Sequence, residues 1–141
     1  MAETLPFRSP AETRGMLLFA HGARDPNWAR PFEAVAAHVA RSDAGCRVRL
    51  AFLEFMTPDL PAAGDALVQE GCTRVDVVPL FLGAGGHVRK DLPALMQVLR
   101  ERHPLVEWVL HRAVGEEDRV ARAMAETALD LAGRAPAEPG S

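Results

Sequence analysis

Four residues of types that bind metals or move protons follow apolar segments of the chain. His21 follows the run Met16–Ala20, Glu54 ends the largely apolar segment RVRLAFLE, and His87 and His111 come after two later apolar runs. A neutral imidazole binds borderline divalent metals and accepts a proton near neutral pH. A carboxylate at the end of an apolar strand must meet a cation, a metal or water. His21, Glu54 and His87 therefore predict an open site for metal or proton transfer.

The turn after His21 also allows a plainer interpretation. The sequence Gly-Ala-Arg-Asp that follows it is typical of a turn in which Asp25 caps the next element and the histidine is merely hydrogen-bonded. The alternative is an imidazole that points into a ligand cleft, as a metal ligand or as a general base. Whether His111 reaches the same cleft stays open at this point.

The segment GAGGHVRKD, residues 83–91, contains three glycines, which tolerate unusual backbone conformations, and two positively charged side chains. Gly85 and Gly86 would let the main chain approach a ligand closely. The segment lacks the Gly-Lys-Ser/Thr ending of a Walker loop and the GxGxxG spacing, which disfavours a nucleotide site. Arg89 and Lys90 would favour an anion near a helix start, where the helix dipole adds to their charge. A solvated helix start, capped by the aspartate that follows them, is the plainer alternative.

Segments with strand-like patterning alternate along the chain with segments of helical spacing. The expected strands are Met16–Ala20, Arg47–Glu54, Arg74–Leu82 and Leu105–His111, and the expected helices are Asn27–Ser42, Pro58–Glu70, Leu92–Arg102 and Glu116–Leu131. This alternation predicts a three-layer α/β fold, with a mainly parallel four-stranded sheet and helices on both faces. In the expected strand order 2-1-3-4, the order reverses between the first and third strands. Such sheets bind ligands at that reversal, beyond the carboxyl ends of the strands, where His21, Glu54 and His87 would meet.

Prolines and glycines suggest where individual elements begin and end. Thr57 and Pro58 predict an N-cap followed by the first residue of a helix. Pro79 indicates an edge position, a bulge or the end of the third strand. Residues 83–90 are expected to form a loop, so that the next helix begins at Leu92.

Length and composition fit one small globular domain. The 141 residues divide into a flexible arm at 1–14, a domain at 15–133 and a flexible tail at 134–141. A formal net charge of −3 argues against a strongly basic nucleic-acid footprint. The N-terminus lacks a signal-peptide pattern, and no apolar run approaches the ~20 residues of a membrane-spanning helix. We therefore expect a cytoplasmic protein with no nucleic-acid partner and no membrane partner.

The remaining cysteines and histidines are expected to be structural or superficial. Cys46 and Cys72 form no CxxC motif and no zinc-ligand spacing, so they predict two reduced structural thiols. His38 falls within an expected helix, and His103 precedes a proline at a helix end, so both are expected at the surface.

Three motifs, taken in their order along the chain, resemble one family. LLFAHGARDP, LAFLEFMTPDLPAA and VVPLFLGAGGHVRKDLP are similar to segments of the CbiX-type chelatases, the small sirohydrochlorin cobaltochelatases. That group is related to siroheme ferrochelatases and more distantly to protoporphyrin ferrochelatase. The resemblance runs from about Met16 to Leu131. Ala23 stands where many relatives have Ser, a departure that should leave the imidazole of His21 unaffected.

The resemblance implies a lyase that inserts a divalent metal, cobalt in cobalamin biosynthesis, into sirohydrochlorin without ATP or an organic cofactor. It implies that His21 and His87 are the two active-site histidines and that Glu54 joins them at the metal. The implied chelatase-like fold agrees with the parallel sheet expected from the residues. Because larger members contain two such halves in one chain, the resemblance also implies a homodimer.

Sirohydrochlorin is a polycarboxylate, so fixed cations at the mouth of the site would help to bind it. By their positions, Arg24, Arg89 and Lys90 are the candidate substrate-binding side chains. The close backbone at Gly85 and Gly86 is a further candidate contact.

Alternatives remain for the metal and for turnover. Iron for siroheme, or nickel, would suit the same ligands, because histidine and glutamate do not discriminate among divalent transition metals. A carrier that binds the metal or the tetrapyrrole without turnover would need the same residues. A flavodoxin-like or response-regulator module is disfavoured, because His21 occupies the junction where an acidic phospho-acceptor cluster would lie.

Overall fold

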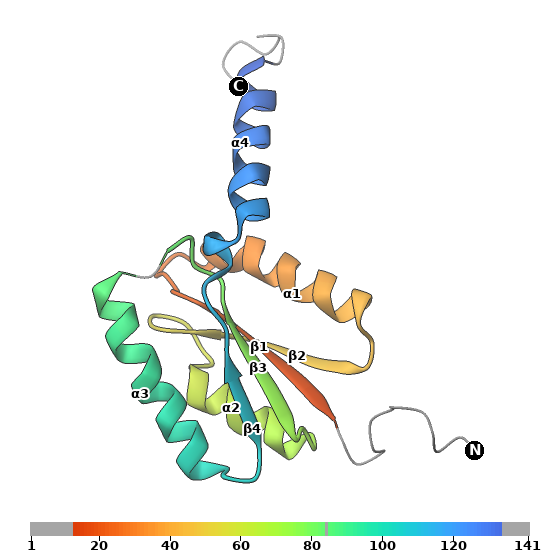
Figure 1. Ribbon diagram of the computed structural model, residues 1–141, viewed down its shortest axis with the longest axis vertical. Helices are drawn as coiled ribbons and strands as arrows, with labels where there is room; N and C mark the ends of the chain where they lie inside the picture. Colours follow the sequence, from red (N-terminus) through yellow and green to blue (C-terminus); the bar gives the residue numbers. More distant parts are fainter. Residues whose placement is uncertain (1–12, 84, 134–141) are drawn as a thin grey trace, which may run out of the picture.

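The computed structural model describes residues 13–83 and 85–133, and for Gly86 and His87 it describes the backbone alone (Figure 1). The arm and tail predicted at 1–14 and 134–141 lie outside these ranges, apart from Thr13 and Arg14, and Arg14 begins the first strand. No helix within the described ranges is both long enough and apolar enough to cross a membrane.

Four parallel strands form a single sheet. They are β1 (Arg14–Ala20), β2 (Cys46–Phe52), β3 (Arg74–Pro79) and β4 (Glu107–Leu110), in the spatial order β2-β1-β3-β4. The registers of β1 with β2 and of β1 with β3 both start at Arg14, so these three strands end close together at one rim. The predicted strand order, with its reversal between β1 and β3, is confirmed. Pro79 lies at the end of β3, which is one of the positions that its missing N–H allows.

Helices cover both faces of the sheet, as predicted. A 3-10 turn, η2 (Pro26–Ala29), leads into α1 (Arg30–Ser42) on one face, whereas α2 (Leu60–Gln69) and α3 (Gly86–Arg102) lie on the other (Figure 1). Successive side chains of a strand point to opposite faces. Phe19 therefore joins the cluster under α2 and α3, and its neighbour Ala20 joins the cluster under α1.

The cluster under α2 and α3 is the main core. Its largest fully buried side chains are Leu17, Phe19, Leu60, Leu67, Val75, Val77, Met96 and Leu99. Full burial of one such side chain contributes about 1.5–3 kcal/mol, so this layer holds α2 and α3 firmly on the strands that carry the rim.

The two cysteines are buried free thiols, in agreement with a structural role. Cys72 lies in the main core, and its burial raises the pKa of its thiol. A thiol held in its neutral form is a poor nucleophile and a poor metal ligand.

The prediction that Thr57 and Pro58 start a helix is wrong. The N-cap of α2 is Asp59, whose Oδ1 accepts a hydrogen bond from the Ala62 amide at 2.9 Å, and Pro61 lies in the first turn. The carbonyl of Pro58 is already used, because it accepts a hydrogen bond from the Phe52 amide at 2.9 Å. The backbone before Asp59 therefore extends the end of β2 instead of beginning a helix.

The prediction of a loop up to residue 90 is also wrong, because α3 begins at Gly86. Gly85 is the N-cap residue, and its carbonyl accepts the Arg89 amide at 3.0 Å. Pro93 suggested a helix start near Leu92, but it lies inside the helix on an exposed position. His87, Arg89 and Lys90 are consequently residues of the first turn of α3.

The last helix extends away from the sheet. α4 (Asp118–Gly133) follows a second 3-10 turn, η3 (Val114–Glu116), and projects beyond the body of the protein (Figure 1). The structure describes the whole of α4, and none of its side chains is buried. The predicted bounds Glu116–Leu131 were two residues early at each end.

Candidate functional site

His21 and Glu54 lie side by side at the carboxyl rim of the sheet. The pairing of β1 with β2 continues past the strand ends, because the Leu53 amide donates to the Ala20 carbonyl at 2.9 Å and the Glu54 amide donates to the His21 carbonyl at 3.0 Å. Both His21 and Glu54 are exposed. The structure thus places the backbones of two of the three predicted metal-site residues next to one another at this rim.

Gly22 makes this close approach possible. Its φ is +91°, a region that L-residues with a side chain rarely adopt, and a Cβ at this position would lie 1.9 Å from the Glu54 carbonyl oxygen. A larger residue would therefore both strain the turn and push the two rim segments apart.

Phe81 supports the imidazole of His21. The two ring centroids are 4.5 Å apart with an interplanar angle of 41°, and Phe81 packs edge-on against Phe19 at 5.8 Å. Phe81 is only 3% exposed, so it presents a fixed surface to the exposed histidine. An aromatic contact of this kind orients a ring without using either of its nitrogen atoms.

Arg24 and Phe55 close the outer side of the rim. The guanidinium carbon of Arg24 lies 4.5 Å from the centroid of the Phe55 ring, a cation–π geometry that links the turn after β1 to the turn after β2. Phe55 has a φ of +67° and is 56% exposed. The pair places a positive charge and an exposed aromatic face beyond Glu54.

The third predicted metal-site residue, His87, belongs to the first turn of α3, and its side chain is outside the described part of the structure. Among the side chains that are described, no three histidine, cysteine, aspartate or glutamate groups lie close enough to hold a metal. His21 and Glu54 alone offer one nitrogen donor and one carboxylate.

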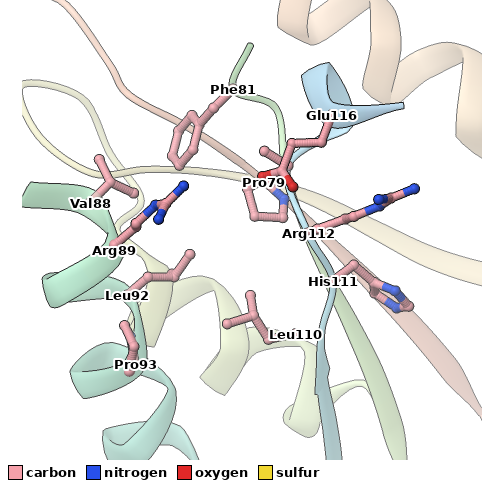
Figure 2. A pocket seen from close by; sticks show the side chains of 11 residues that line it. Pro79, Phe81, Val88, Arg89, Leu92, Pro93, Leu110, His111, Arg112 and Glu116 are labelled. Carbon is pink, nitrogen blue, oxygen red and sulfur yellow. The ribbon is translucent and has the colours of Figure 1, made fainter. Parts of the chain in front are cut away.

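A cavity of about 320 Å³ opens between α3 and β4, next to the rim (Figure 2). Its wall is largely apolar and includes Phe81, which also contacts His21. Figure 2 shows the Arg89 side chain reaching from α3 towards Phe81 and Pro79. Arg89, one of the predicted substrate-binding residues, thus lines this cavity, whereas Lys90 is exposed and does not line it.

Arg112 and Glu116 also line the cavity and were missed from the sequence. The only signal in the sequence was position, since Arg112 lies two residues after the end of β4 and therefore belongs to the same rim as His21. The Arg112 guanidinium is paired with Glu117, with Nε 2.9 Å from a carboxylate oxygen. The cavity mouth therefore carries both signs of charge.

His111 also lines this cavity, but its imidazole is bonded to another side chain. Its Nε2 lies 2.8 Å from Oδ1 of Asp76, and Figure 2 shows its imidazole turned away from α3. Burial by itself would raise the pKa of Asp76, but hydrogen bonds from Arg74 and His111 outweigh that influence and lower the pKa. His111 is therefore a partner of Asp76 on the opposite face of the sheet.

The other two histidines differ from one another. His38 is exposed on α1, as predicted. His103 is partly buried instead of lying freely at the surface, because its Nε2 is 2.7 Å from Oδ1 of Asp65 and its carbonyl accepts the Trp108 indole N–H at 3.3 Å. It links the end of α3 to α2 and to β4.

Solved structures with the same arrangement are chelatase-like α/β proteins. A crystal structure described as a CbiX protein of cobalamin (vitamin B12) biosynthesis from Marinobacter aquaeolei has a TM-score of 0.76 and 30% identity, over 86% of this chain and 99% of that one. The sirohydrochlorin chelatase SirB from Bacillus subtilis, in complex with cobalt, has a TM-score of 0.71 and 23% identity, over 84% of this chain and 51% of that one. The second likeness concerns the fold alone.

Relatives with assigned activities are similar at the level of sequence. A sirohydrochlorin cobaltochelatase of Priestia megaterium is 33% identical over 103 residues, which are 72% of this chain and 33% of that protein. A sirohydrochlorin ferrochelatase of the same organism is 32% identical over 75 residues, 53% of this chain and 28% of that protein. A sirohydrochlorin cobaltochelatase of Methanosarcina barkeri is 31% identical over 87 residues, 62% of this chain and 67% of that protein. The chain thus spans about a third of the length of the Priestia proteins.

The CbiX family profile matches residues 15–131, which include every element from β1 to most of α4. The chain belongs to the CbiX family. The resemblance and the chelatase-like fold expected from the sequence are confirmed.

Proposed function

We propose that this protein is a sirohydrochlorin chelatase, a metal-inserting lyase of tetrapyrrole biosynthesis that acts in the cytoplasm without ATP. The observation that carries the proposal is the adjacency of the His21 and Glu54 backbones at the carboxyl rim of the sheet, maintained by consecutive backbone hydrogen bonds. Membership of the CbiX family supports the same activity, as do the names of the relatives.

The chemistry of insertion matches these two side chains. A divalent metal enters the macrocycle only when the pyrrole N–H protons leave and the metal loses bound water. A neutral imidazole at His21 can hold the metal and then accept a proton, and the Glu54 carboxylate can do the same. Because both groups are exposed, proton transfer to water can follow directly. Few protein ligands also favour release of the metal into the ring, since a closed four-ligand site would retain it.

His87 is the third proposed member of the site. The Gly85 N-cap begins α3 immediately before it, so its backbone lies at the end of the segment that connects β3 with α3. A second imidazole facing His21 would complete a site with an open coordination position for the macrocycle nitrogens.

Arg24, Arg89 and Lys90 are the proposed partners of the substrate carboxylates, together with the backbone at Gly85 and Gly86. Arg24 lies over Phe55 on one side of the rim, and Arg89 lines the cavity on the other side. A flat, apolar macrocycle with charged edges would suit an exposed aromatic ring flanked by guanidinium groups.

Cobalt is the metal we propose, in cobalamin biosynthesis. The support comes from the cobaltochelatases of Priestia and Methanosarcina, at 33% and 31% identity. Iron, for siroheme, is the second candidate because the Priestia ferrochelatase is 32% identical. Nickel stays a third candidate, since histidine and carboxylate ligands bind all three metals. Two copies of the chain would form the two-lobed unit, with sirohydrochlorin as the partner molecule and neither nucleic acid nor membrane involved.

Anaerobic insertion into sirohydrochlorin with Co²⁺, Fe²⁺ and Ni²⁺ in parallel, followed by absorbance, tests the proposal. We expect His21→Ala and Glu54→Ala each to lower the insertion rate by about 100-fold or more, a typical contribution of one acid–base group. His38→Ala is the matched control, because this exposed histidine lies on α1 and should leave the rate unchanged. Normal insertion by both rim variants would refute the proposal.

A carrier without turnover is separated from an enzyme by counting product. With sirohydrochlorin and metal in large excess over the protein, an enzyme forms many metallated molecules per chain, whereas a carrier stops at one. The fastest metal in the same assay identifies the preferred substrate, and a rate for iron well above that for cobalt would redirect the proposal to siroheme biosynthesis.

A further inference from the structure

Phe55 combines an exposed aromatic ring with an unusual backbone conformation. Its φ is +67°, whereas the other two positive φ values in the described part of the chain belong to Gly22 and Gly71. Glycine adopts this region freely, but a residue with a side chain is strained there. Strained residues of this kind cluster at functional sites, so the outlier points to a use for the Phe55 side chain.

Backbone contacts on both sides of Phe55 impose this conformation. The Glu54 amide donates to the His21 carbonyl at 3.0 Å, and the Phe52 amide donates to the Pro58 carbonyl at 2.9 Å. The chain therefore leaves the rim after Glu54 and is back beside the end of β2 at Pro58. Within this reversal the positive φ falls on an aromatic residue, at a position where glycine would fit without strain.

Packing within the chain does not account for the ring. Leu53 packs against the main core and Met56 against the cluster under α1, but neither cluster of the described residues includes Phe55. Phe55 is 56% exposed, and the Arg24 guanidinium lies over its ring at 4.5 Å from the centroid. An arginine stacked on one face orients an aromatic ring and leaves the other face open to a ligand.

We infer that Phe55 is a substrate-binding residue whose ring stacks on the flat face of the macrocycle, while Arg24 holds the ring in place and adds positive charge beside it. The identity of the macrocycle rests on the proposed function. Consecutive Cα atoms are about 3.8 Å apart, so a macrocycle that receives a metal at His21 and Glu54 extends over the next residue along the rim. Contact with an aromatic ring favours a ligand that has a broad π face over a compact anion of the same charge.

Binding of metal-free sirohydrochlorin, titrated by fluorescence quenching, tests this role without any need for metal insertion. Phe55→Asn should weaken binding by about 10-fold, and it should unfold at the same urea concentration as the wild type or a higher one, because asparagine tolerates a positive φ. Phe55→Leu keeps an apolar side chain without a flat face and should weaken binding similarly, whereas Phe55→Tyr keeps the ring and should retain the wild-type affinity. Leu105→Asn is the matched control and should leave the affinity unchanged, since Leu105 is 96% exposed and precedes β4, at the end of the sheet opposite the rim.

The same measurements separate failure of this inference from failure of the proposed function. Wild-type affinity in both Phe55→Asn and Phe55→Leu, with insertion by the wild type intact, overturns the inference alone. Absence of both binding and insertion in the wild type overturns the proposed function and the inference with it. Light scattering examines the other possible occupant of the ring. A changed mass of Phe55→Asn with unchanged affinity would place the ring in a contact between copies of the chain, and this result also overturns the inference.

Discussion

The backbone carbonyl of His21 accepts a hydrogen bond from the amide of Glu54 at 3.0 Å, so the main chains of these two residues are joined by a continuation of the sheet pairing. The parallel pairing of β1 and β2 positions His21 one residue and Glu54 two residues beyond their strands, where a ligand can approach from solvent. The geometry of the site therefore depends on backbone contacts that small substitutions can test.

Gly22→Ala should disrupt the pairing of His21 with Glu54. The positive φ costs an alanine about 1–2 kcal/mol, and a Cβ 1.9 Å from the Glu54 carbonyl adds about 1–3 kcal/mol of crowding. Gly71→Ala is a matched control, since Gly71 has a φ of +93° but nothing within 4 Å of its Cβ. Urea denaturation should show the larger loss for Gly22→Ala, and only this variant should lose insertion activity. Equal losses of stability would mean that the rim has room to relax.

The sheet and the rim residues were predictable because their causes are local. Alternating apolar patterns gave four strands in the correct order, and His21 and Glu54 each follow such a run, so their convergence follows from parallel topology. The two wrong helix starts have a different cause. At Pro58 a carbonyl is taken by the Phe52 amide, and at Gly86 a glycine N-cap without a side-chain bond begins α3. Asp59 and Pro61 are themselves acceptable start signals for α2, so the local sequence offers two starts and the Phe52 contact decides between them, whereas the glycine start of α3 has no capping side chain.

Long-range contacts account for what the sequence could not show. The bond between His111 and Asp76 joins residues 35 positions apart, and it engages the imidazole of His111 with a residue of β3. The contact between Phe81 and His21 also joins residues far apart in the sequence. The apolar segment that contains Phe81 does not indicate which ring Phe81 will pack against. The projection of α4 was likewise unpredictable, because its amphipathic pattern is the same for a helix that packs on its own sheet.

Phe81→Leu should slow insertion while the protein stays folded. The substitution keeps an apolar side chain in the core, at a cost of about 1–2 kcal/mol, but removes the ring that lies 4.5 Å from His21. A misplaced imidazole should lower kcat by about 10-fold or more with little change in KM. Phe19→Leu is the control, because Phe19 is equally buried and packs on Phe81. A similar fall in kcat for both variants would assign the effect to core packing.

Arg89→Ala should weaken substrate binding more than it slows chemistry. A charged hydrogen bond to a carboxylate contributes about 1.5–3 kcal/mol, so KM should rise by about 10-fold or more with kcat nearly unchanged. Added salt should raise the KM of the wild type towards that of the variant, because screening weakens the same attraction. Arg41→Ala, at the exposed end of α1, is the control and should leave KM unchanged. An unaltered KM for Arg89→Ala would remove Arg89 from the substrate contacts, and Arg24→Ala would then be the next variant to measure.

Asp76 should make the stability of the protein depend on pH in the acid range. Its pKa in the folded protein is lowered below the ordinary value of 3.8, because hydrogen bonds from Arg74 and His111 outweigh the effect of burial. A carboxylate with a lowered pKa contributes stability that is fully present above the unfolded pKa and is lost as the pH falls through the folded pKa. Urea denaturation from pH 6 down to pH 2.5 should therefore show the wild type losing its advantage over Asp76→Asn below about pH 4. Glu107→Gln is the control, because Glu107 faces the same Arg74 at 3.6 Å but is 64% exposed, where ion pairs contribute little. If Asp76→Asn and the wild type lose stability in parallel over this range, the hydrogen bonds from Arg74 and His111 do not stabilise the Asp76 carboxylate in solution.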